Sequence, residues 1–257
     1  MNASTGVPEI EIAGMTKRYG DGRAVLDSID LTVGKQEFIS VIGSSGCGKS
    51  TILKLIAGLT APTSGTIRVE GMAPQNAREI TSFVFQDATL LPWRTVKNNI
   101  GLGLELEGAA TAQREKKIAE LLELVGLNHV ARAYPRELSG GMKMRVSIAR
   151  ALATSPRLML LDEPFAALDE MSRDRLNEEI LRLRAEQNWT AVFVTHSVSE
   201  AVFLSDRIFV MAPNPGRIHA EFLVQLPAPR TAAIRNSPEF DAIVARVSHT
   251  LRETLRP

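Results

Sequence analysis

The chain has 257 residues, 44% of them hydrophobic and 23% charged, and its formal net charge of +1 excludes the basic stripe of a dedicated nucleic-acid binder. The one cysteine, Cys47, cannot form an intrachain disulfide, the N-terminus lacks a secretory signal pattern, and no apolar run approaches the about 20 residues of a membrane span. We therefore expect a folded cytoplasmic protein without a nucleic-acid partner, which reaches a membrane only through another protein.

Short β-like runs separated by turn residues dominate the first part of the chain, at residues 9–20, 28–33, 37–43 and 65–71. The third of them, "EFISVIG", leads directly into "GSSGCGKST". A helix is predicted from Thr51 to Ala57, because Gly58 and Pro62 supply a C-terminal stop. The glycine-rich segment therefore lies between a strand and a helix.

That segment matches the phosphate-loop pattern G-x-x-x-x-G-K-[ST], and a flexible glycine turn is the weaker alternative at this position. The backbone N–H groups would surround phosphate oxygens, Lys49 would reach the β and γ phosphates, and the Ser50 hydroxyl would ligate Mg²⁺. The neighbouring helix N-terminus would favour a thiolate at Cys47, but no chemistry at a phosphate loop requires a thiol, so we expect Cys47 to be a small side chain that fits the loop. We also predict that nucleotide blocks its modification by thiol reagents. The predicted nucleotide contacts are Gly43, Ser44, Ser45, Gly46, Cys47, Gly48, Lys49, Ser50 and Thr51.

Helical periodicity replaces the strand pattern between Leu102 and Thr154. Apolar residues recur with helical spacing from Ile118 to Val125 and again from Met144 to Leu152. The second helix begins at "LSGGM", where Ser139 can cap exposed N–H groups and form a second anion site, or simply an ordinary helix start. We predict a helical subdomain over about residues 87–155, inserted into an α/β domain.

Apolar strands resume at residues 157–164, 190–197 and 206–213, with an amphipathic helix around residues 176–183 between the first two. Nearly continuous apolar strands that alternate with helices favour a parallel sheet covered on both faces. A Pro- and Arg-bearing linker then leads into a last helix at residues 237–256. We accordingly divide the chain into residues 1–226 and 227–257.

Polar side chains follow several of these strands, at the sheet edge where ligands bind in α/β folds. Asp162 would hold Mg²⁺, and Glu163 would orient or deprotonate the water that attacks the γ-phosphate. His196 would contact the γ-phosphate, and the Gln86 amide would reach the metal or the water. Taken singly, the two acids have an alternative as helix caps, and His196 and Gln86 as ordinary polar residues.

Taken in order, Tyr19, the phosphate loop, Gln86, "LSGGM", "LMLLDE", "ALD" and His196 resemble the nucleotide-binding subunit of an ATP-binding-cassette (ABC) transporter. The resemblance implies an ABC-type P-loop NTPase fold: a mainly parallel core sheet, an antiparallel β subdomain and an inserted helical subdomain. It implies that Tyr19 stacks on adenine, that Gln86 opens the loop that senses a membrane subunit, and that Asp169 lies in a loop crossing between two cassettes.

The signature segment acquires a role from the same resemblance. Ser139, Gly140 and Gly141 of one copy would contact the γ-phosphate held by Lys49 of a second copy, which makes a homodimer the working unit. Met142 and Met144 stand where the family often has glutamine, and Met144 leaves an interfacial hydrogen bond in doubt. Gln36 stands where glycine is frequent in the family.

A narrower resemblance, carried by "LLPWRTVKNNI", "PNPGRI" and "LPAPR", is to the cassettes of bacterial nitrate, sulfonate and taurine importers. It implies an ATPase that uses ATP and Mg²⁺ beneath two permease subunits, at the cytoplasmic face of the inner membrane, with a solute-binding protein in the complex. Leu90, Leu91, Pro92 and Trp93 would form the permease contact, unless Trp93 packs in the core. The alternatives are a soluble ABC ATPase acting on nucleic acid or ribosomes, an importer of another solute such as a pyrimidine precursor, and a small-molecule kinase.

Overall fold

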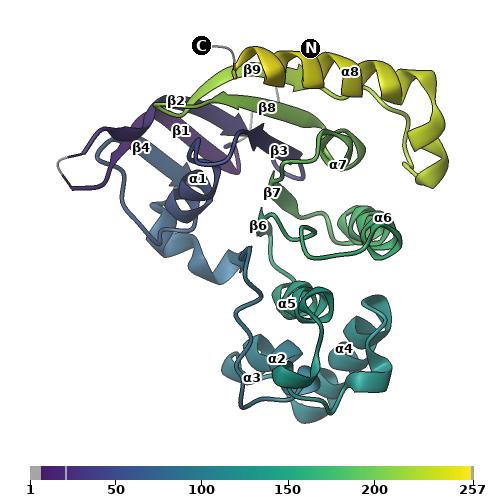
Figure 1. The fold of residues 1–257 in the computed structure, drawn as a ribbon. Helices are drawn as coiled ribbons and strands as arrows, with labels where there is room; N and C mark the ends of the chain where they lie inside the picture. The colour runs from purple at the N-terminus through teal and green to yellow at the C-terminus, as the bar shows by residue number, and fades with distance from the viewer. Residues whose placement is uncertain (1–6, 21, 256–257) are drawn as a thin grey trace.

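Two β-sheets organise the computed structural model, which describes residues 7–20 and 22–255 (Figure 1). The core sheet has the strand order β5-β6-β7-β3-β8-β9, in which β9 alone runs antiparallel to its neighbour. Its strands are β3 (Phe38–Gly43), β5 (Thr81–Val84), β6 (Leu158–Asp162), β7 (Thr190–Val194), β8 (Arg207–Ala212) and β9 (Arg217–Leu223). The second sheet is antiparallel, in the order β2-β1-β4, and comprises β1 (Ile10–Arg18), β2 (Ala24–Val33) and β4 (Ser64–Val69).

The central strands of the core sheet are buried on both faces, as their apolar sequences predict. In β3, Phe38 and Ile42 belong to a hydrophobic cluster on the helical side, whereas Ile39 and Val41 belong to a cluster on the side of the antiparallel sheet. The alternation follows from the two-residue period of a strand. The expected ABC-type architecture, with its mainly parallel sheet and separate antiparallel sheet, is confirmed.

Helix α1 (Lys49–Ile56) lies between the two sheets and packs in the second cluster through Ile52 and Leu53. It begins at Lys49 rather than at Thr51, because Gly48 adopts a left-handed φ of 100° and ends the glycine loop there. Its C-cap is Ala57, followed by Gly58 with a φ of 65°, as the sequence predicted. A 3₁₀ helix, η1 (Pro74–Ile80), then leads from β4 to β5.

The segment between β5 and β6 is helical and forms one end of the molecule, at the bottom of Figure 1. Ile118, Leu121 and Leu122 are the buried residues of its α4, in agreement with the predicted spacing. The elements are α2 (Val96–Ile100), α3 (Leu102–Leu106), α4 (Thr111–Leu124), η2 (Asn128–Val130), η3 (Pro135–Glu137) and α5 (Gly140–Ala153).

Helices α6 (Glu170–Gln187), α7 (Val198–Leu204) and α8 (Pro238–Glu253) cover the helical side of the core sheet and share its cluster. The last of them packs beside α7 and β8, where Phe240 and Val247 are buried (Figure 1). The short η4 (Ala232–Asn236) precedes it. The C-terminal segment thus shares the core of the cassette, and the boundary at residues 226 and 227 stays a prediction. Within residues 7–20 and 22–255, none of the helices is sufficiently long and apolar to cross a bilayer.

The sequence analysis assigned no element to β9. This strand lies at the edge of the core sheet, where its residues are alternately exposed and half-buried. Ile218, Ala220 and Phe222 occupy the half-buried positions, whereas the apolar Leu223 is exposed. Because β9 pairs with one strand and has one covered face, its sequence shows only a weak alternation of apolar and polar residues. The central strands show continuous apolar runs instead.

Candidate functional site

The glycine loop after β3 has the backbone geometry of an anion cradle. Gly46 and Gly48 have φ values of 78° and 100°, a region that other residues rarely enter, so that successive N–H groups can face one centre. The Lys49 ammonium donates to the carbonyl oxygens of Gly43 and Ser44, at 2.9 and 3.0 Å. The Ser44 hydroxyl is buried without a hydrogen-bond partner, which fits a loop whose remaining polar capacity is completed by phosphate oxygens.

The Cys47 side chain takes no part in that cradle. It is 1% exposed and belongs to the hydrophobic cluster that contains α1. Burial raises the pKa of the Cys47 thiol, which opposes the thiolate that the helix N-terminus would favour, and the burial agrees with the expected small side chain that fits the loop. Cys47 therefore contributes packing under the loop, and only its backbone remains a candidate contact of the nucleotide.

A carboxylate and a hydroxyl from different segments meet beside the loop. The Ser50 hydroxyl, at the start of α1, donates to Asp162 Oδ1 at 2.9 Å, at the end of β6. Burial raises the pKa of Asp162, and the Ser50 hydrogen bond only partly opposes it, so a cation at this point would relieve the cost of the buried charge. The described residues contain no group of three or more His, Cys, Asp or Glu side chains that could hold a metal. A hydroxyl and one carboxylate suit Mg²⁺, which commonly takes its other ligands from phosphates and water.

Glu163 and His196 are brought together at the same sheet edge. The His196 Nδ1 lies 3.4 Å from Glu163 Oε2, with the histidine side chain 66% exposed and the glutamate side chain 20% exposed. Glu163 has a φ of 47°, a conformation that costs free energy in a residue with a side chain, and its N–H donates to the Val194 carbonyl at 2.9 Å. This backbone conformation accompanies the approach of the Glu163 carboxylate to His196.

The strand order explains how these residues come together. Strands β5, β6, β7 and β3 are neighbours, and parallel, so their carboxyl ends share one edge. Gln86 follows β5, Asp162 ends β6, His196 follows β7 and the phosphate loop follows β3. Gln86 is exposed beyond the end of its strand, and its contact with metal or water stays a prediction.

An arginine that the sequence analysis missed holds the segment after Gln86. Arg150, on α5, donates to the carbonyl oxygens of Ala88 and Thr89, at 3.1 and 3.0 Å, and to the Thr89 hydroxyl at 3.1 Å. Burial lowers the pKa of the Arg150 guanidinium. In the sequence, the indication of this contact was a charged residue among the apolar residues that form the buried face of α5. This contact joins the Gln86 segment to the helix that starts at the signature.

Gly216, to which the sequence analysis assigned no role, lies against the backbone of the phosphate loop at Cys47. A Cβ atom on Gly216 would lie 2.0 Å from the Cys47 carbonyl oxygen and 3.0 Å from Leu26 Cδ2. The Gly216 N–H donates to the Val25 carbonyl at 2.9 Å, and the Asp27 N–H donates to the Gly216 carbonyl at 3.0 Å. The turn signal in "PNPGRI" marks the turn, but its approach to a loop far away in sequence is a tertiary feature.

We predict that Gly216→Ala weakens ATP binding at least about 10-fold, or about 1.4 kcal/mol, because the new methyl group displaces the Cys47 carbonyl and distorts the cradle. Titration with a fluorescent ATP analogue measures the dissociation constant. Gly34→Ala is the matched control, since its nearest atom would be Glu37 Oε2 at 3.5 Å, an ordinary contact. Equal affinities of the two variants would show that the Gly216 contact does not shape the loop.

The signature segment forms a capped helix start, as predicted. Ser139 Oγ accepts a hydrogen bond from the Met142 N–H at 3.3 Å, and a Cβ on Gly141 would lie 3.1 Å from the Ala167 carbonyl oxygen. Two residues along from Ala167, Asp169 caps α6 by accepting a hydrogen bond from the Ser172 N–H at 2.9 Å, which lowers the pKa of Asp169. The glycines and the Asp169 loop are thus packed together on one surface.

The two signature methionines differ in position. Met144 is 2% exposed and lies in the hydrophobic core on the helical side, and the effect of this methionine on a dimer interface stays a prediction. Met142 is half-buried and packs against the same core. Met144 therefore contributes packing within its own chain.

Two aromatic residues are free for contacts outside the chain. Tyr19 is 51% exposed just after β1, and the Lys17 ammonium lies 4.8 Å from the centre of its ring. Trp93 is 69% exposed, so the alternative that it packs in the core is wrong. Next to Trp93, Arg94 forms an ion pair of 2.6 Å with Glu105 on α3. Stacking of Tyr19 on adenine and contact of Trp93 with a permease stay predictions.

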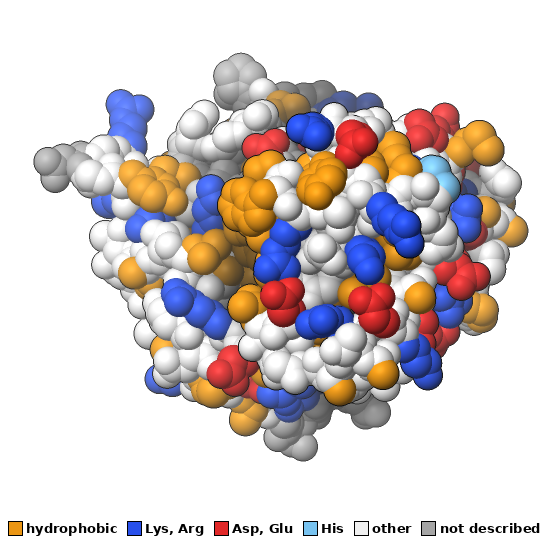
Figure 2. Space-filling model, turned by 90° about the horizontal axis from the view of Figure 1, so that it is seen from below, with side chains coloured by type: hydrophobic (Ala, Val, Ile, Leu, Met, Phe, Trp, Pro, Cys, Tyr) orange, Lys and Arg blue, Asp and Glu red, His pale blue; other side chains and the backbone are white. Residues whose placement is uncertain are grey.

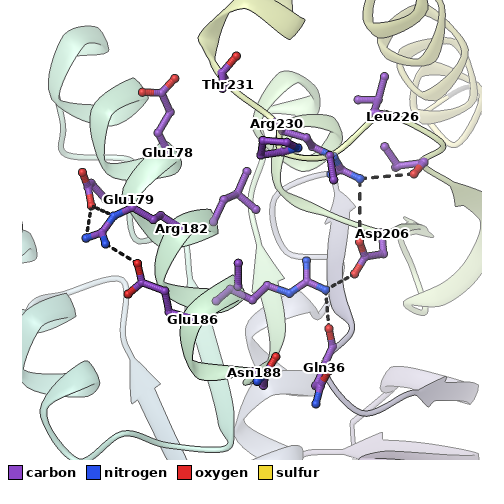
Figure 3. A pocket seen from close by; sticks show the side chains of 16 residues that line it. Gln36, Glu178, Glu179, Arg182, Glu186, Asn188, Asp206, Leu226, Arg230 and Thr231 are labelled. Carbon is purple, nitrogen blue, oxygen red and sulfur yellow. Dashed lines mark hydrogen bonds and ion pairs between the residues drawn. The ribbon is translucent and has the colours of Figure 1, made fainter.

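A cleft of about 1050 Å³ lies among α6, the start of β8 and the C-terminal linker, and no residue of the phosphate loop lines it (Figure 3). Most of its charged groups are paired: Arg184 with Asp206 and the Gln36 carbonyl, and Arg182 with Glu179 and Glu186. Glu178 accepts a hydrogen bond from the Ala232 N–H. Gln36 has a φ of 61°, which agrees with a position where glycine is frequent in similar chains. The cleft therefore presents satisfied polar groups rather than a prepared ligand site.

Comparisons with known proteins agree with this geometry. The family model described as ABC transporter matches residues 26–166. The chain is 44% identical to the aliphatic sulfonates import ATP-binding protein of Bacillus licheniformis, over 90% of this chain and 89% of that protein. It is 42% identical to the nitrate import ATP-binding protein of Synechocystis sp., over 88% of both chains. A solved ATP-binding cassette, in a dimeric post-hydrolysis state bound to ADP and Pi, superposes with a TM-score of 0.78 at 30% identity, over 85% of this chain and 100% of that one.

Proposed function

The chain belongs to the ABC transporter family as an ATP-binding subunit and ATPase, and from this premise we propose that it energises import of a small anion such as nitrate, a sulfonate or taurine. The observation that carries the proposal is the shared strand edge, where the phosphate loop, the Ser50–Asp162 pair and the Glu163–His196 pair meet. Similar identities to a nitrate and a sulfonate importer support a small anion as solute without choosing between them.

The catalytic roles follow from the chemistry of the groups at this edge. Lys49 holds the β and γ phosphates by exchanging its two carbonyl partners for phosphate oxygens. Ser50 and Asp162 would hold Mg²⁺, with Gln86 as a further ligand, and the ion would neutralise charge on the phosphates. Glu163 accepts a proton from the attacking water. His196, whose Nδ1 lies 3.4 Å from Glu163 Oε2, donates a hydrogen bond to the γ-phosphate.

The working unit that we propose is a homodimer. Ser139 and the two glycines after it have hydrogen-bond donors at a helix N-terminus, which suits the γ-phosphate of the partner's nucleotide. Ala167 and Leu168 pack against that segment, and Asp169, which follows them, would cross to the second copy. The dimeric state of the similar solved cassette supports this arrangement.

Membrane subunits are further proposed partners, and a solute-binding protein completes the complex. Leu91, Pro92 and Trp93 form an exposed or half-exposed apolar patch just after the Gln86 segment. At the helical end of the molecule, hydrophobic, basic and acidic side chains are interspersed (Figure 2), which supports a protein partner over nucleic acid on that face. The subunit would then lie peripherally at the cytoplasmic face of the inner membrane.

Co-purification tests the transporter assignment. We predict that the tagged chain isolated from detergent-solubilised membranes brings with it a polytopic membrane protein, identified by mass spectrometry. Trp93→Ala should weaken that association about 30-fold, since exposed aromatic anchors contribute about 2 kcal/mol or more at interfaces. Leu223→Ala is the matched control, because Leu223 is also exposed, at 64%, but lies on β9.

The purified complex then identifies the solute class. Its ATPase rate should rise when the co-purified binding protein is loaded with nitrate, an alkanesulfonate or taurine, one of which is expected to be the most effective. Stimulation only by an uncharged solute or a pyrimidine precursor would reject the anion, and association solely with ribosomes would reject the transporter.

A further inference from the structure

A buried carboxylate lies beside the loop that carries His196. Glu200, on α7, is 6% exposed, and its Oε2 accepts a hydrogen bond of 2.6 Å from the Thr195 hydroxyl. The same hydroxyl accepts a hydrogen bond of 3.0 Å from the Ser197 N–H. The residues before and after His196 are thus tied to one hydroxyl, which is itself oriented by Glu200.

The other side of this carboxylate is connected to the loop before α6. Arg173 Nε lies 3.4 Å from Glu200 Oε1, as an ion pair, and Arg173 Nη2 donates to the Leu168 carbonyl at 3.0 Å. Leu168 immediately precedes Asp169, the residue predicted to cross between two copies. A continuous chain of polar contacts therefore joins the Asp169 loop to the His196 loop through Glu200.

Packing alone does not account for a charged residue at this position. Burial raises the pKa of Glu200, and the Thr195 hydrogen bond, Arg173, His196 and Arg235 only oppose that effect. Arg235, on η4, is also occupied by an ion pair of 3.1 Å with Asp174. An apolar side chain at a buried site often gives equal or greater stability than a buried ion pair, whereas a satisfied polar network holds one geometry.

We propose that Thr195 and Glu200 are positioning residues for ATP hydrolysis, which hold His196 in register with the Asp169 loop. This inference rests on the proposed role of His196 at the γ-phosphate. Neither residue is assigned a contact with the nucleotide: Thr195 holds the backbone on both sides of the histidine, and Glu200 orients the Thr195 hydroxyl. Because a displacement of about 1 Å in a catalytic group can cost as much as about 100-fold in rate, loss of this contact should appear in kcat.

The test compares variants of nearly equal shape in the full-length protein. Thr195→Val, which lacks the hydroxyl, and Glu200→Gln, which weakens its acceptor, should each lower kcat about 10- to 100-fold, with KM for ATP changed less than about twofold. Thr195→Ser, which keeps the hydroxyl, should restore kcat to within about threefold. The double variant should be no slower than the slower single variant, because both changes break one contact.

A variant of a second buried threonine, Thr190, distinguishes a positioning role of Thr195 from a role in stability alone. Thr190→Val removes a hydroxyl from the opposite end of β7, where Oγ1 accepts from the Gln36 N–H at 2.8 Å. It should lower Tm by an amount similar to that of Thr195→Val and leave kcat unchanged. If Thr195→Val lowers Tm but keeps the wild-type kcat, Thr195 is only structural and the inference is overturned.

Variants made in a protein that already carries His196→Ala distinguish this inference from the proposed function. In single-turnover assays with radiolabelled ATP, Thr195→Val should produce no further loss when His196→Ala is already present. If Thr195→Val lowers the hydrolysis rate by the same factor in the His196→Ala variant as in the wild type, Thr195 acts independently of His196, which contradicts the inference. If His196→Ala alone hydrolyses ATP at the wild-type rate, the proposed role of His196 fails, whereas a slow His196→Ala with a normal Thr195→Val overturns only the positioning role.

Discussion

Glu163→Gln is expected to lower ATP turnover about 10²- to 10⁴-fold while ATP binding stays within about twofold of wild type. The amide preserves the size of the side chain and its strained backbone position, but it cannot accept the proton of the attacking water. Because ATP then persists, the variant should also accumulate as a dimer in the presence of ATP and Mg²⁺. Phosphate release, nucleotide titration and size-exclusion chromatography with light scattering measure the three quantities.

Glu170→Gln is the matched control for this substitution. Glu170 is exposed in the first turn of α6, just beyond the Asp169 cap, and has no assigned role at the strand edge. Its variant should hydrolyse ATP normally and return to monomer as ATP is consumed. Near-normal hydrolysis by Glu163→Gln would remove Glu163 from the role of base.

Lys49→Ala is expected to reduce kcat/KM for ATP at least about 100-fold. The substitution removes the only ammonium that lies within the loop and leaves the carbonyl oxygens of Gly43 and Ser44 without their donor. Both changes act on the phosphates, so we expect weaker ATP binding together with slower hydrolysis. Steady-state phosphate release and a nucleotide titration give the two contributions.

Lys54→Ala tests whether any basic residue of α1 would serve. Lys54 is exposed on the same helix, in its last turn, and should lose little activity. Thermal unfolding of Lys49→Ala distinguishes a local loss from a collapsed loop, since Lys49 is itself buried. An active, folded Lys49→Ala variant would contradict the assignment of the phosphate loop.

The features that local sequence determines were predicted well. β3 and the glycine loop followed from an apolar run and from positions that require positive φ, and the Ser139 cap followed from its own helix start. The strand-end acids and His196 were placed on one edge because parallel strands share the direction of their carboxyl ends. The predicted roles of these residues in catalysis stay predictions.

The features that depend on distant partners were missed. The Cys47 side chain turns into the core, which reverses the effect expected from the adjacent helix N-terminus. Gly216 and Arg150 act on segments far from them in the chain, so neither has a local signal that names its partner. Glu200 was given no role from the sequence, because its significance comes from its burial and its hydrogen bond with Thr195.

The position of β3 in the middle of the core sheet also governs the order in which the chain can fold. This strand is made early, yet both of its neighbours, β7 and β8, lie between residues 190 and 212. During synthesis, a strand that is buried on both faces must wait for about 150 residues before either edge is paired. The phosphate loop, near the start of the sequence, is therefore among the last parts of the cassette to take shape on the ribosome, and nascent chains have a long interval in which chaperones can protect the exposed strand.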